Sequence, residues 1–421
     1  MSQPDVVVIV GGGHAAAIAA SELRRLGFNG QITVVSAETV APYDRTTLSK
    51  SALLSGEDPP RLWPELDQGI PEIDLRLGTA VMSFDPTARS LTLSSGEQIG
   101  YDRLLLTMGA EPQRLSLPGA TADGVLYLRN FEDARELRSR LERDVRVAII
   151  GGGLIGLEVA ACASSLGHPV SVIEAGKRVL GRSVSESVAS ALVDLHREHG
   201  VVFHCATAPT AIATTTEGLV RGVELADGSF IDADVIVVGI GIVPRDQLAA
   251  EAGLSVADGV LVDAQCRTSD EHIYAAGDVI RFPTNDVGET IRLEAWQPAC
   301  RQAGVAAAAM LGHSVSYHDC PWGWSDQYGA VVQTVGVQPS DAEVIDYGDP
   351  HAPRGLLSLS LVDGNLVAAA GVSIGSGIAK SIRLVQMTLD AGRCPAPGEL
   401  HARRGDLASL EQYLQRSRRA G

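Results

Sequence analysis

Two stretches of the chain share one pattern of apolar, glycine and small residues. Residues 145–150 form an apolar run rich in β-branched side chains, which predicts a buried strand. Glycines occupy 151–153, and small and apolar residues then recur at helical spacing over 154–166. Residues 6–16 begin the same way, with a strand over 6–10 followed by a glycine turn. The pattern therefore predicts two strand–turn–helix units in one chain.

The glycine turns have the spacing of a dinucleotide-binding fingerprint, G-x-G-x-x-G. Its positions are Gly151, Gly153 and Gly156 in the second copy and Gly11, Gly13 and Ala16 in the first. The first glycine permits a tight turn, the second lets a pyrophosphate approach the backbone, and the third small residue lets helix and strand pack closely. The free N–H groups and the dipole at the helix N-terminus favour the phosphates.

An acidic residue follows the next strand in both copies. The strand over 170–173 ends at Glu174, and the strand over 32–35 is followed by Ala37 and Glu38. A carboxylate about 20 residues after the glycines can bind a ribose 2′-OH. Two complete copies predict two bound dinucleotides; the alternative is two structural βαβ units without ligands. Because Glu174 would repel a 2′-phosphate, we expect NADH rather than NADPH, although Lys177 and Arg178 lie close by in the sequence.

The remaining pattern predicts further elements and a change of character near residue 318. Strands are expected over 75–81, 90–93, 101–108, 125–129, 201–203, 234–242 and 260–262, and helices over 130–143, 185–199 and 298–311. Short strands over 330–337, 356–362 and 366–372 with a helix over 378–389 predict a small α+β domain. After about residue 403 we expect a charged tail that need not be ordered.

Composition narrows the functional classes. The chain has 421 residues, 45% of them apolar, and a formal net charge of −17. This charge disfavours non-specific binding to nucleic acid or anionic membranes. Its six cysteines are scattered and form no C-x-x-C pair, so we expect no disulfide framework and no metal site. Residues 1–5 lack a basic residue, and no apolar run approaches the ~18 residues of a membrane span, so we expect a cytoplasmic protein.

Four residues outside the fingerprints have chemical interest. Lys50 ends a predicted loop over 42–50, which follows the strand over 32–35. The sequence pattern around Lys50 equally fits a solvated surface lysine. Asp278 directly follows the small residues 275–277, which permit close backbone approach. Trp322 and Trp324 are two residues apart in a segment predicted to be extended, so both side chains point to one face. Two interpretations of this shared face are open, a functional role and core packing.

The chain resembles the FAD-dependent NADH:ferredoxin reductases that serve bacterial Rieske dioxygenases and cytochromes P450. The motifs that carry the resemblance are the two fingerprints, Pro-Tyr-Asp-Arg at 42–45, Leu-Ser-Lys at 48–50, residues 104–109 and 274–279, and the tryptophan segment 321–327. The chain departs from the family pattern at Thr46, Thr47, Met108 and Gly323.

This resemblance implies a glutathione-reductase-like α/β fold. It has two Rossmann-like dinucleotide-binding domains, one for FAD and one for NAD, and a small α+β C-terminal domain. The implied FAD-binding domain is discontinuous, over 1–112 and 240–318. The NAD-binding domain covers 113–239, the C-terminal domain 319–402 and the charged tail 403–421.

Site residues also follow from the resemblance. FAD would contact Gly11, Gly13, His14, Ala15, Ala16, Ala37, Glu38, Arg45, Lys50, Val81, Arg129, Asp278 and Trp296. NADH would contact Gly151, Gly153, Leu154, Ile155, Gly156, Glu158 and Glu174. Lys50 and Glu158 would act on the nicotinamide side, and Trp322 and Trp324 would lie on the electron exit route.

The implied reaction passes a hydride from NADH to FAD and single electrons to an iron–sulfur ferredoxin, an acidic and transient partner that feeds an oxygenase. The chain itself would be a monomer or weak homodimer. The alternatives are an NADH oxidase or rubredoxin-type reductase, and a redox-sensing flavoprotein resembling apoptosis-inducing factor.

Overall fold

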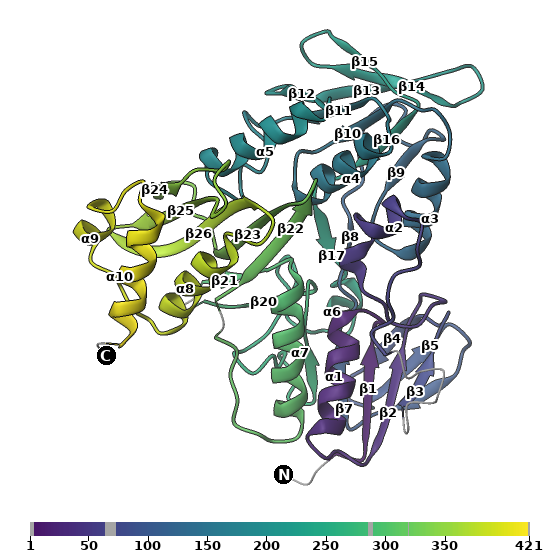
Figure 1. Ribbon diagram of the computed structural model, residues 1–421. Coiled ribbons are helices and arrows are strands. Elements are labelled where there is room, and N and C mark those ends of the chain that lie inside the picture. The colour runs from purple at the N-terminus through teal and green to yellow at the C-terminus, as the bar shows by residue number, and fades with distance from the viewer. Residues whose placement is uncertain (1–3, 64–72, 285–288, 319, 420–421) are drawn as a thin grey trace. The chain divides into compact units, whose positions relative to one another are not determined.

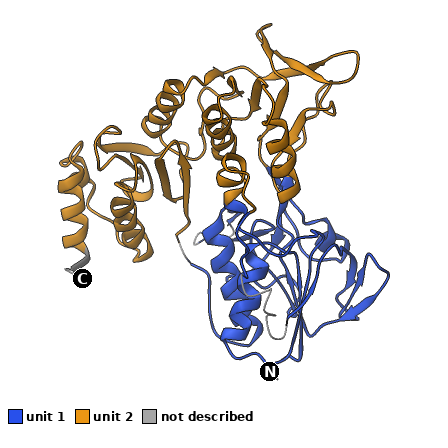
Figure 2. Ribbon diagram, turned by 45° about the vertical axis from the view of Figure 1, so that its right-hand side comes forward, with its two compact units in different colours: residues 1–46, 59–111, 242–319 blue, residues 47–58, 112–241, 320–421 orange. Residues whose placement is uncertain are grey.

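The computed structural model describes residues 4–63, 73–284, 289–318 and 320–419. The chain forms two compact units, which Figure 2 colours separately. Unit 1 contains residues 1–46, 59–111 and 242–319, and unit 2 contains residues 47–58, 112–241 and 320–421. The predicted domain boundary at residue 319 and the last two residues of the predicted tail lie outside the described residues.

Unit 1 is built on a parallel five-stranded sheet with the order β19-β7-β1-β2-β3. Its strands are β1 (Val6–Val10), β2 (Gln31–Val35), β3 (Ile73–Arg76), β7 (Arg103–Leu106) and β19 (Ile273–Ala275). Side chains of β1 alternate: Val7 and Ile9 pack with helices α1 (His14–Arg25) and α7 (Trp296–Met310), whereas Val8 and Val10 pack into a second core. Figure 1 shows α1 and α7 side by side. Burial on both faces explains the continuous apolar run of β1.

Smaller elements complete unit 1. They are the antiparallel sheet of β4 (Val81–Asp85), β5 (Ser90–Leu93) and β6 (Gln98–Gly100), the sheet of β18 (Val260–Leu261), β20 (Ile280–Pro283) and β21 (Thr290–Ile291), and helix α6 (Gln247–Glu251). The strand expected over 75–81 is wrong, because Gly78, with φ of +60°, makes a turn between β3 and β4. Three short elements lie where the chain passes from one unit to the other. They are the single-turn helix η1 (Arg45–Thr47) and the paired strands β8 (Ala110–Pro112) and β17 (Ile242–Pro244).

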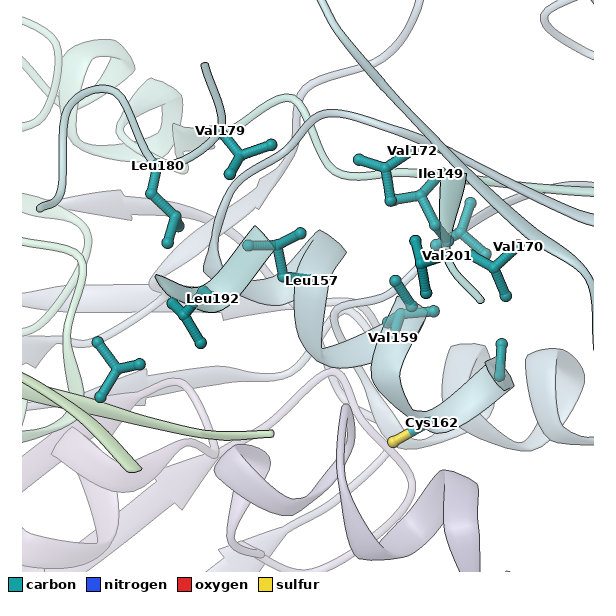
Figure 3. Close-up of a cluster of buried hydrophobic side chains, with 14 of the residues drawn as sticks. Ile149, Leu157, Val159, Cys162, Val170, Val172, Val179, Leu180, Leu192 and Val201 are labelled. Carbon is teal, nitrogen blue, oxygen red and sulfur yellow. The ribbon is translucent and has the colours of Figure 1, made fainter. Parts of the chain in front are cut away.

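A second parallel sheet, with the order β12-β11-β10-β16-β9, forms the first half of unit 2. It contains β9 (Val125–Tyr127), β10 (Val147–Ile150), β11 (Val170–Glu174), β12 (Val202–Cys205) and β16 (Val235–Val238). Helices α2 (Ser51–Leu54), α3 (Phe131–Arg140), α4 (Leu154–Ser165) and α5 (Glu186–Glu198) and the antiparallel sheet of β13 (Pro209–Thr214), β14 (Val220–Leu225) and β15 (Phe230–Asp232) accompany it. Leu157 and Val159 of α4 belong to the same buried cluster as Ile149 and Val172 of the sheet (Figure 3). The strand expected over 234–242 ends at Val238, because a glycine turn follows.

The second half of unit 2 is an antiparallel sheet with the order β22-β23-β26-β25-β24. Its elements are β22 (Trp322–Gln327), β23 (Ala330–Gly336), β24 (Glu343–Gly348), β25 (Leu356–Val362), β26 (Asn365–Ile374), α8 (Ala379–Asp390), α9 (Pro397–His401) and α10 (Leu407–Arg419). The predicted fold class, two parallel α/β sheets followed by a small α+β domain, is confirmed.

The expectation of a tail that need not be ordered is wrong for residues 407–419, which form α10. Leu407, Leu410 and Leu414 of this helix are buried in the C-terminal core. Their spacing of three and four residues puts them on one helix face, which the surrounding charged residues concealed in the sequence.

Candidate functional site

The turn between β1 and α1 has one glycine that the chain's own packing requires and one that it does not. Gly11 has φ of +120°, and a Cβ there would lie 2.3 Å from the Thr107 carbonyl oxygen. At Gly13, directly before α1, the nearest atom to an added Cβ is Arg45 Nε at 3.7 Å. The space in front of Gly13 and the N–H groups of the first turn of α1 therefore suit an anionic ligand such as a pyrophosphate.

Charged side chains gather around this turn. Arg45 forms an ion pair with Glu38, and the Tyr43 hydroxyl donates a hydrogen bond to Glu38 Oε2 (2.7 Å). Burial lowers the pKa of Arg45, but the charges of Tyr43, Glu38 and Asp278 outweigh this effect and raise it. Arg45 thus pairs with one predicted FAD contact, Glu38, and the charge of another, Asp278, also favours its cationic form.

His14, the first residue of α1, faces Asp44. Its Nε2 lies 3.3 Å from Asp44 Oδ1. Burial raises the pKa of Asp44, but the interaction with His14 and the hydrogen bonds from Thr46 outweigh it and lower the pKa to about 2. Thr46, where the family pattern differs, donates from its hydroxyl to this carboxylate at 2.7 Å. The threonine substitution therefore has a local structural role.

The N-terminal part of α7 and the turn after β19 lie beside α1. A Cβ added to Gly277 would lie 3.4 Å from Ala15 Cβ, and the Trp296 ring lies 6.2 Å from the His14 ring. Gln302 of α7 accepts a hydrogen bond from the Gly277 N–H (3.0 Å), while its Nε2 is buried without a partner among the described residues. A bound ligand with an acceptor oxygen would satisfy this donor, so the site fits a polar cofactor.

The residues predicted to contact the adenosine part of FAD lie close together in the structure. The Gly78 and Thr79 N–H groups donate to the carbonyl oxygens of Glu38 and Ser36, both at 2.9 Å. These bonds bring the segment before Val81 next to Ala37 and Glu38. Arg129 is different, because it belongs to unit 2, where it precedes the N-cap of α3, Asn130. Its contact with FAD stays a prediction.

The fingerprint turn of unit 2 repeats the division seen in unit 1. A Cβ added to Gly151 would lie 2.3 Å from the Gly239 carbonyl oxygen, and one added to Gly156 would lie 2.2 Å from the Gly151 carbonyl oxygen. A Cβ added to Gly153 would have no atom nearer than 4.0 Å. Leu154 and Ile155 open α4, and Ile155 is exposed. Packing alone thus explains Gly151 and Gly156, whereas the space at Gly153 is open to a ligand.

Glu174 is fixed beside this turn. Its carboxylate accepts hydrogen bonds from the Gly152 N–H (2.8 Å) and the Gly176 N–H (2.6 Å). The two backbone donors orient the side chain toward the glycine turn before any ligand arrives. The glycine turn and Glu174, the predicted ribose-binding acid, are 22 residues apart in the sequence and lie together in the structure.

Lys50 and Glu158 form an ion pair within unit 2. Lys50 Nζ lies 2.8 Å from Glu158 Oε1, and the Glu158 side chain is 2% exposed. Lys50 is therefore not the solvated surface lysine that the sequence also allowed. Sequence reasoning missed the two hydroxyls that complete the carboxylate's contacts, Ser49 and Ser325. The only signal was that both lie inside motifs already noted at 48–50 and 321–327.

Trp322 and Trp324 stack on one face of β22, with ring centroids 5.2 Å apart and planes inclined by 17°. The prediction that both side chains share a face is confirmed. Trp324 Nε1 donates to Asp326 Oδ2 (3.1 Å) on that same face. Both rings are half-buried, and Trp322 packs against the core of the C-terminal domain.

Residues 5–303 match the family model described as pyridine nucleotide-disulphide oxidoreductase, and residues 322–411 match the one described as reductase C-terminal. The chain belongs to the pyridine nucleotide-disulphide oxidoreductase family. Membership implies binding of FAD and NAD(H), and the residues around both glycine turns fit such ligands. The six cysteines are free, and no group of metal-ligating side chains occurs among the described residues. Within the same residues, no helix is long and apolar enough to cross a membrane.

Several relatives in this family are ferredoxin reductases. The chain is 40% identical over 403 residues to the anthranilate 1,2-dioxygenase system ferredoxin–NAD(+) reductase component of Burkholderia cepacia, covering 94% of this chain and 97% of that protein. It is similar to the ferredoxin reductase for the CYP199A2 system from Rhodopseudomonas palustris, with a TM-score of 0.89, 36% identity and coverage of 94% and 97%. It is also similar to putidaredoxin reductase in its covalent complex with putidaredoxin, with a TM-score of 0.90, 31% identity and coverage of 100% of both chains.

Proposed function

We propose that this protein is the NADH-dependent ferredoxin reductase component of an oxygenase system. The two glycine turns support this function most directly. Each has one position that is open to a ligand, and the structure places an acidic residue beside each turn. Two nucleotide sites in one chain suit an enzyme that holds a permanent flavin cofactor and a nicotinamide substrate together.

We assign FAD to residues 1–112 and 240–318 and NADH to residues 113–239, with residues 319–402 as the C-terminal domain. In the FAD site, the first turn of α1 would hold the pyrophosphate, with Arg45 adding positive charge. Glu38 and the Ala37 backbone would hold the adenosine ribose, Asp278 the ribityl or phosphate region, and the backbone at Trp296 the flavin ring. In the NADH site, α4 would hold the pyrophosphate and Glu174 the ribose.

The overall reaction balances as one NADH and two oxidised ferredoxins giving NAD⁺, two reduced ferredoxins and one proton. Bound FAD supplies the exchange between a two-electron donor and a one-electron acceptor. The chain's own residues orient the reactants: Lys50 and Glu158 would position the nicotinamide, and small misplacements there lower the rate steeply.

The experiment follows FAD reduction by NADH in a stopped-flow instrument and then turnover with a purified oxygenase-system ferredoxin, a rubredoxin or dioxygen as the acceptor. Strong dependence of turnover on ferredoxin supports the proposal. Equal or faster turnover with rubredoxin or dioxygen would favour the alternative reductase and oxidase functions. Slow turnover with every acceptor, with NADH shifting the oligomeric state, would favour a redox-sensing flavoprotein.

We further assign the stacked Trp322–Trp324 pair to the electron exit route. Two large rings on one face of an edge strand offer a partner an apolar contact surface. Replacing either ring by alanine should slow ferredoxin reduction and leave flavin reduction by NADH unchanged. Val344→Ala, at the opposite edge strand β24, is the matched control. Unchanged ferredoxin kinetics in both tryptophan variants would remove the pair from the route.

A further inference from the structure

A chain of buried hydrogen bonds within unit 2 ends on Glu158. Ser325 Oγ lies 2.6 Å from Glu158 Oε1, Gln327 Nε2 lies 2.9 Å from Ser325 Oγ, and His196 Nε2 lies 2.7 Å from Gln327 Oε1. His196 Nδ1 in turn lies 3.3 Å from the Tyr328 hydroxyl, which also bonds Ser164. Ser325, Gln327 and His196 are at most 2% exposed.

The chemistry of the groups fixes the direction of this chain. The Glu158 carboxylate, paired with Lys50, can only accept, so the Ser325 hydroxyl donates to it. Ser325 then accepts from the Gln327 amide nitrogen, which leaves the Gln327 carbonyl oxygen to accept from His196. His196 must therefore carry its proton on Nε2. Burial, which outweighs the hydrogen bond to Gln327, lowers the pKa of His196 to about 4 and keeps the ring neutral.

Every donor in the chain consequently points toward Glu158. The neutral His196 Nδ1 can only accept, and the Tyr328 hydroxyl lies within hydrogen-bond distance of it. Hydrogen bonds that run in one direction polarise one another, and at the end of such a chain they favour a negative charge. Since Lys50 and Ser325 share Oε1 and Ser49 bonds Oε2, both carboxylate oxygens are held.

Strand β22 of the C-terminal domain carries the two residues of this hydrogen-bond chain that are nearest to Glu158, Ser325 and Gln327. Ser325 and Gln327 project from one face of β22, while Trp322 and Trp324 project from the other, because side chains alternate along a strand. Its inner face contacts α4, which begins at the fingerprint turn, and α5, which carries His196. One strand thus carries both the polar chain and the tryptophan pair.

We propose that Ser325, Gln327 and His196 are positioning residues for the reaction with NADH, acting through Glu158 on the Lys50–Glu158 pair. This inference rests on the proposed function, because it requires that the pair lies on the nicotinamide side. The hydrogen-bond chain holds the carboxylate in one orientation, so that Lys50 is fixed as well. The C-terminal domain then contributes to hydride transfer in addition to any part in electron exit.

A spectroscopic experiment tests the direction of the chain without turnover. The full-length protein with FAD is labelled with ¹⁵N-histidine, and the His196 signals are identified by their loss in His196→Gln. We expect a neutral ring with the proton on Nε2. A proton on Nδ1 would mean that the donors do not run toward Glu158 and would overturn the proposal.

A kinetic experiment tests the positioning role. Ser325→Ala should lower the limiting rate of flavin reduction by NADH about tenfold, with FAD content and melting temperature close to those of Ser360→Ala. Ser360 is the matched control, since it is a fully buried serine of the same domain that bonds Gln338 instead. Gln327→Met should also lower the limiting rate of flavin reduction by NADH. This variant replaces Ser325→Ala in the experiment if Ser325→Ala fails to fold.

The outcomes separate the two claims. Equal limiting rates in Ser325→Ala and Ser360→Ala, or a change confined to the dissociation constant for NADH, would overturn the positioning role. If NADH fails to reduce the wild-type flavin, the proposed function fails, and the histidine spectrum still decides whether the directed chain exists.

Discussion

At the scale of single residues, the Lys50–Glu158 pair makes the most specific prediction. Among the described residues, removing Lys50 leaves the nearly buried Glu158 carboxylate with the Ser49 and Ser325 hydroxyls as its donors. Loss of one partner of such an ion pair lowers the free energy of unfolding by several kcal/mol at most. Lys50→Met should therefore lower the limiting rate of flavin reduction by NADH at least about tenfold while FAD stays bound.

The double variant Lys50→Met/Glu158→Gln supplies the control. Because it removes both charges, its melting temperature should be higher than that of Lys50→Met alone, and the two single effects should not add. Additive effects on rate and stability would show that the two side chains act independently.

Glu174 makes a prediction about the choice of nucleotide. Two backbone N–H groups hold its carboxylate beside the glycine turn, where a 2′-phosphate would meet a like charge. We expect the kcat/KM for NADH to exceed that for NADPH at least about tenfold, and Glu174→Ser to narrow this ratio. Glu198→Ser, on α5, is the control for loss of a surface charge. Near-equal kcat/KM values for the two nucleotides in the wild type would contradict the assignment.

His196 makes a prediction about pH. Its pKa is about 4 in the folded protein, against an ordinary value of 6.5 for histidine, so the unfolded chain binds more protons between these values. Stability should therefore be complete above pH 6.5 and fall as the pH falls toward 4, by up to about 3 kcal/mol from this group. The melting temperatures of wild type and His196→Gln at pH 5 and pH 7.5 test this. The variant should lose less on acidification, and an equal loss would exclude His196 as the source.

At the scale of elements, helix α10 is the feature that the sequence least revealed. Its buried face carries Leu407, Leu410 and Leu414, and its buried Glu411 accepts from Lys380 Nζ (2.5 Å) and the Ser381 hydroxyl (2.7 Å) of α8. Leu410→Ala should destabilise the C-terminal domain by about 2–5 kcal/mol. Exposed Gln412→Ala on the same helix should change stability little. Equal melting temperatures for these two variants would mean that α10 does not stabilise the domain.

The elements that were predicted correctly are those whose structure is determined by residues close together in the sequence. Both fingerprint turns follow from glycines whose added Cβ atoms would meet backbone oxygens, and β1, β10 and β11 follow from apolar runs buried on both faces. The strand expected over 75–81 failed because one glycine turn divides it. Helix α10 was missed because a charged composition concealed three leucines at helical spacing.

At the scale of the whole molecule, the sequence predicted residues but rarely their partners. Glu158 was identified from the family resemblance, yet the hydrogen bonds that hold it come from positions that no spacing rule connects. Ser325 lies 167 residues from Glu158, and His196 lies 131 residues from Gln327. Such contacts depend on how β22 packs against α4 and α5, and a single sequence contains no direct signal of that packing.

Ferredoxin reduction driven by NADH tests the account as a whole. The FAD-loaded protein is mixed anaerobically with NADH and an excess of purified oxygenase-system ferredoxin, and the ferredoxin absorbance is followed. The account predicts two ferredoxins reduced for each NADH oxidised, with NADH much more effective than NADPH. Flavin that is reduced by NADH but does not reduce ferredoxin, under conditions in which it reduces rubredoxin or dioxygen, would contradict it.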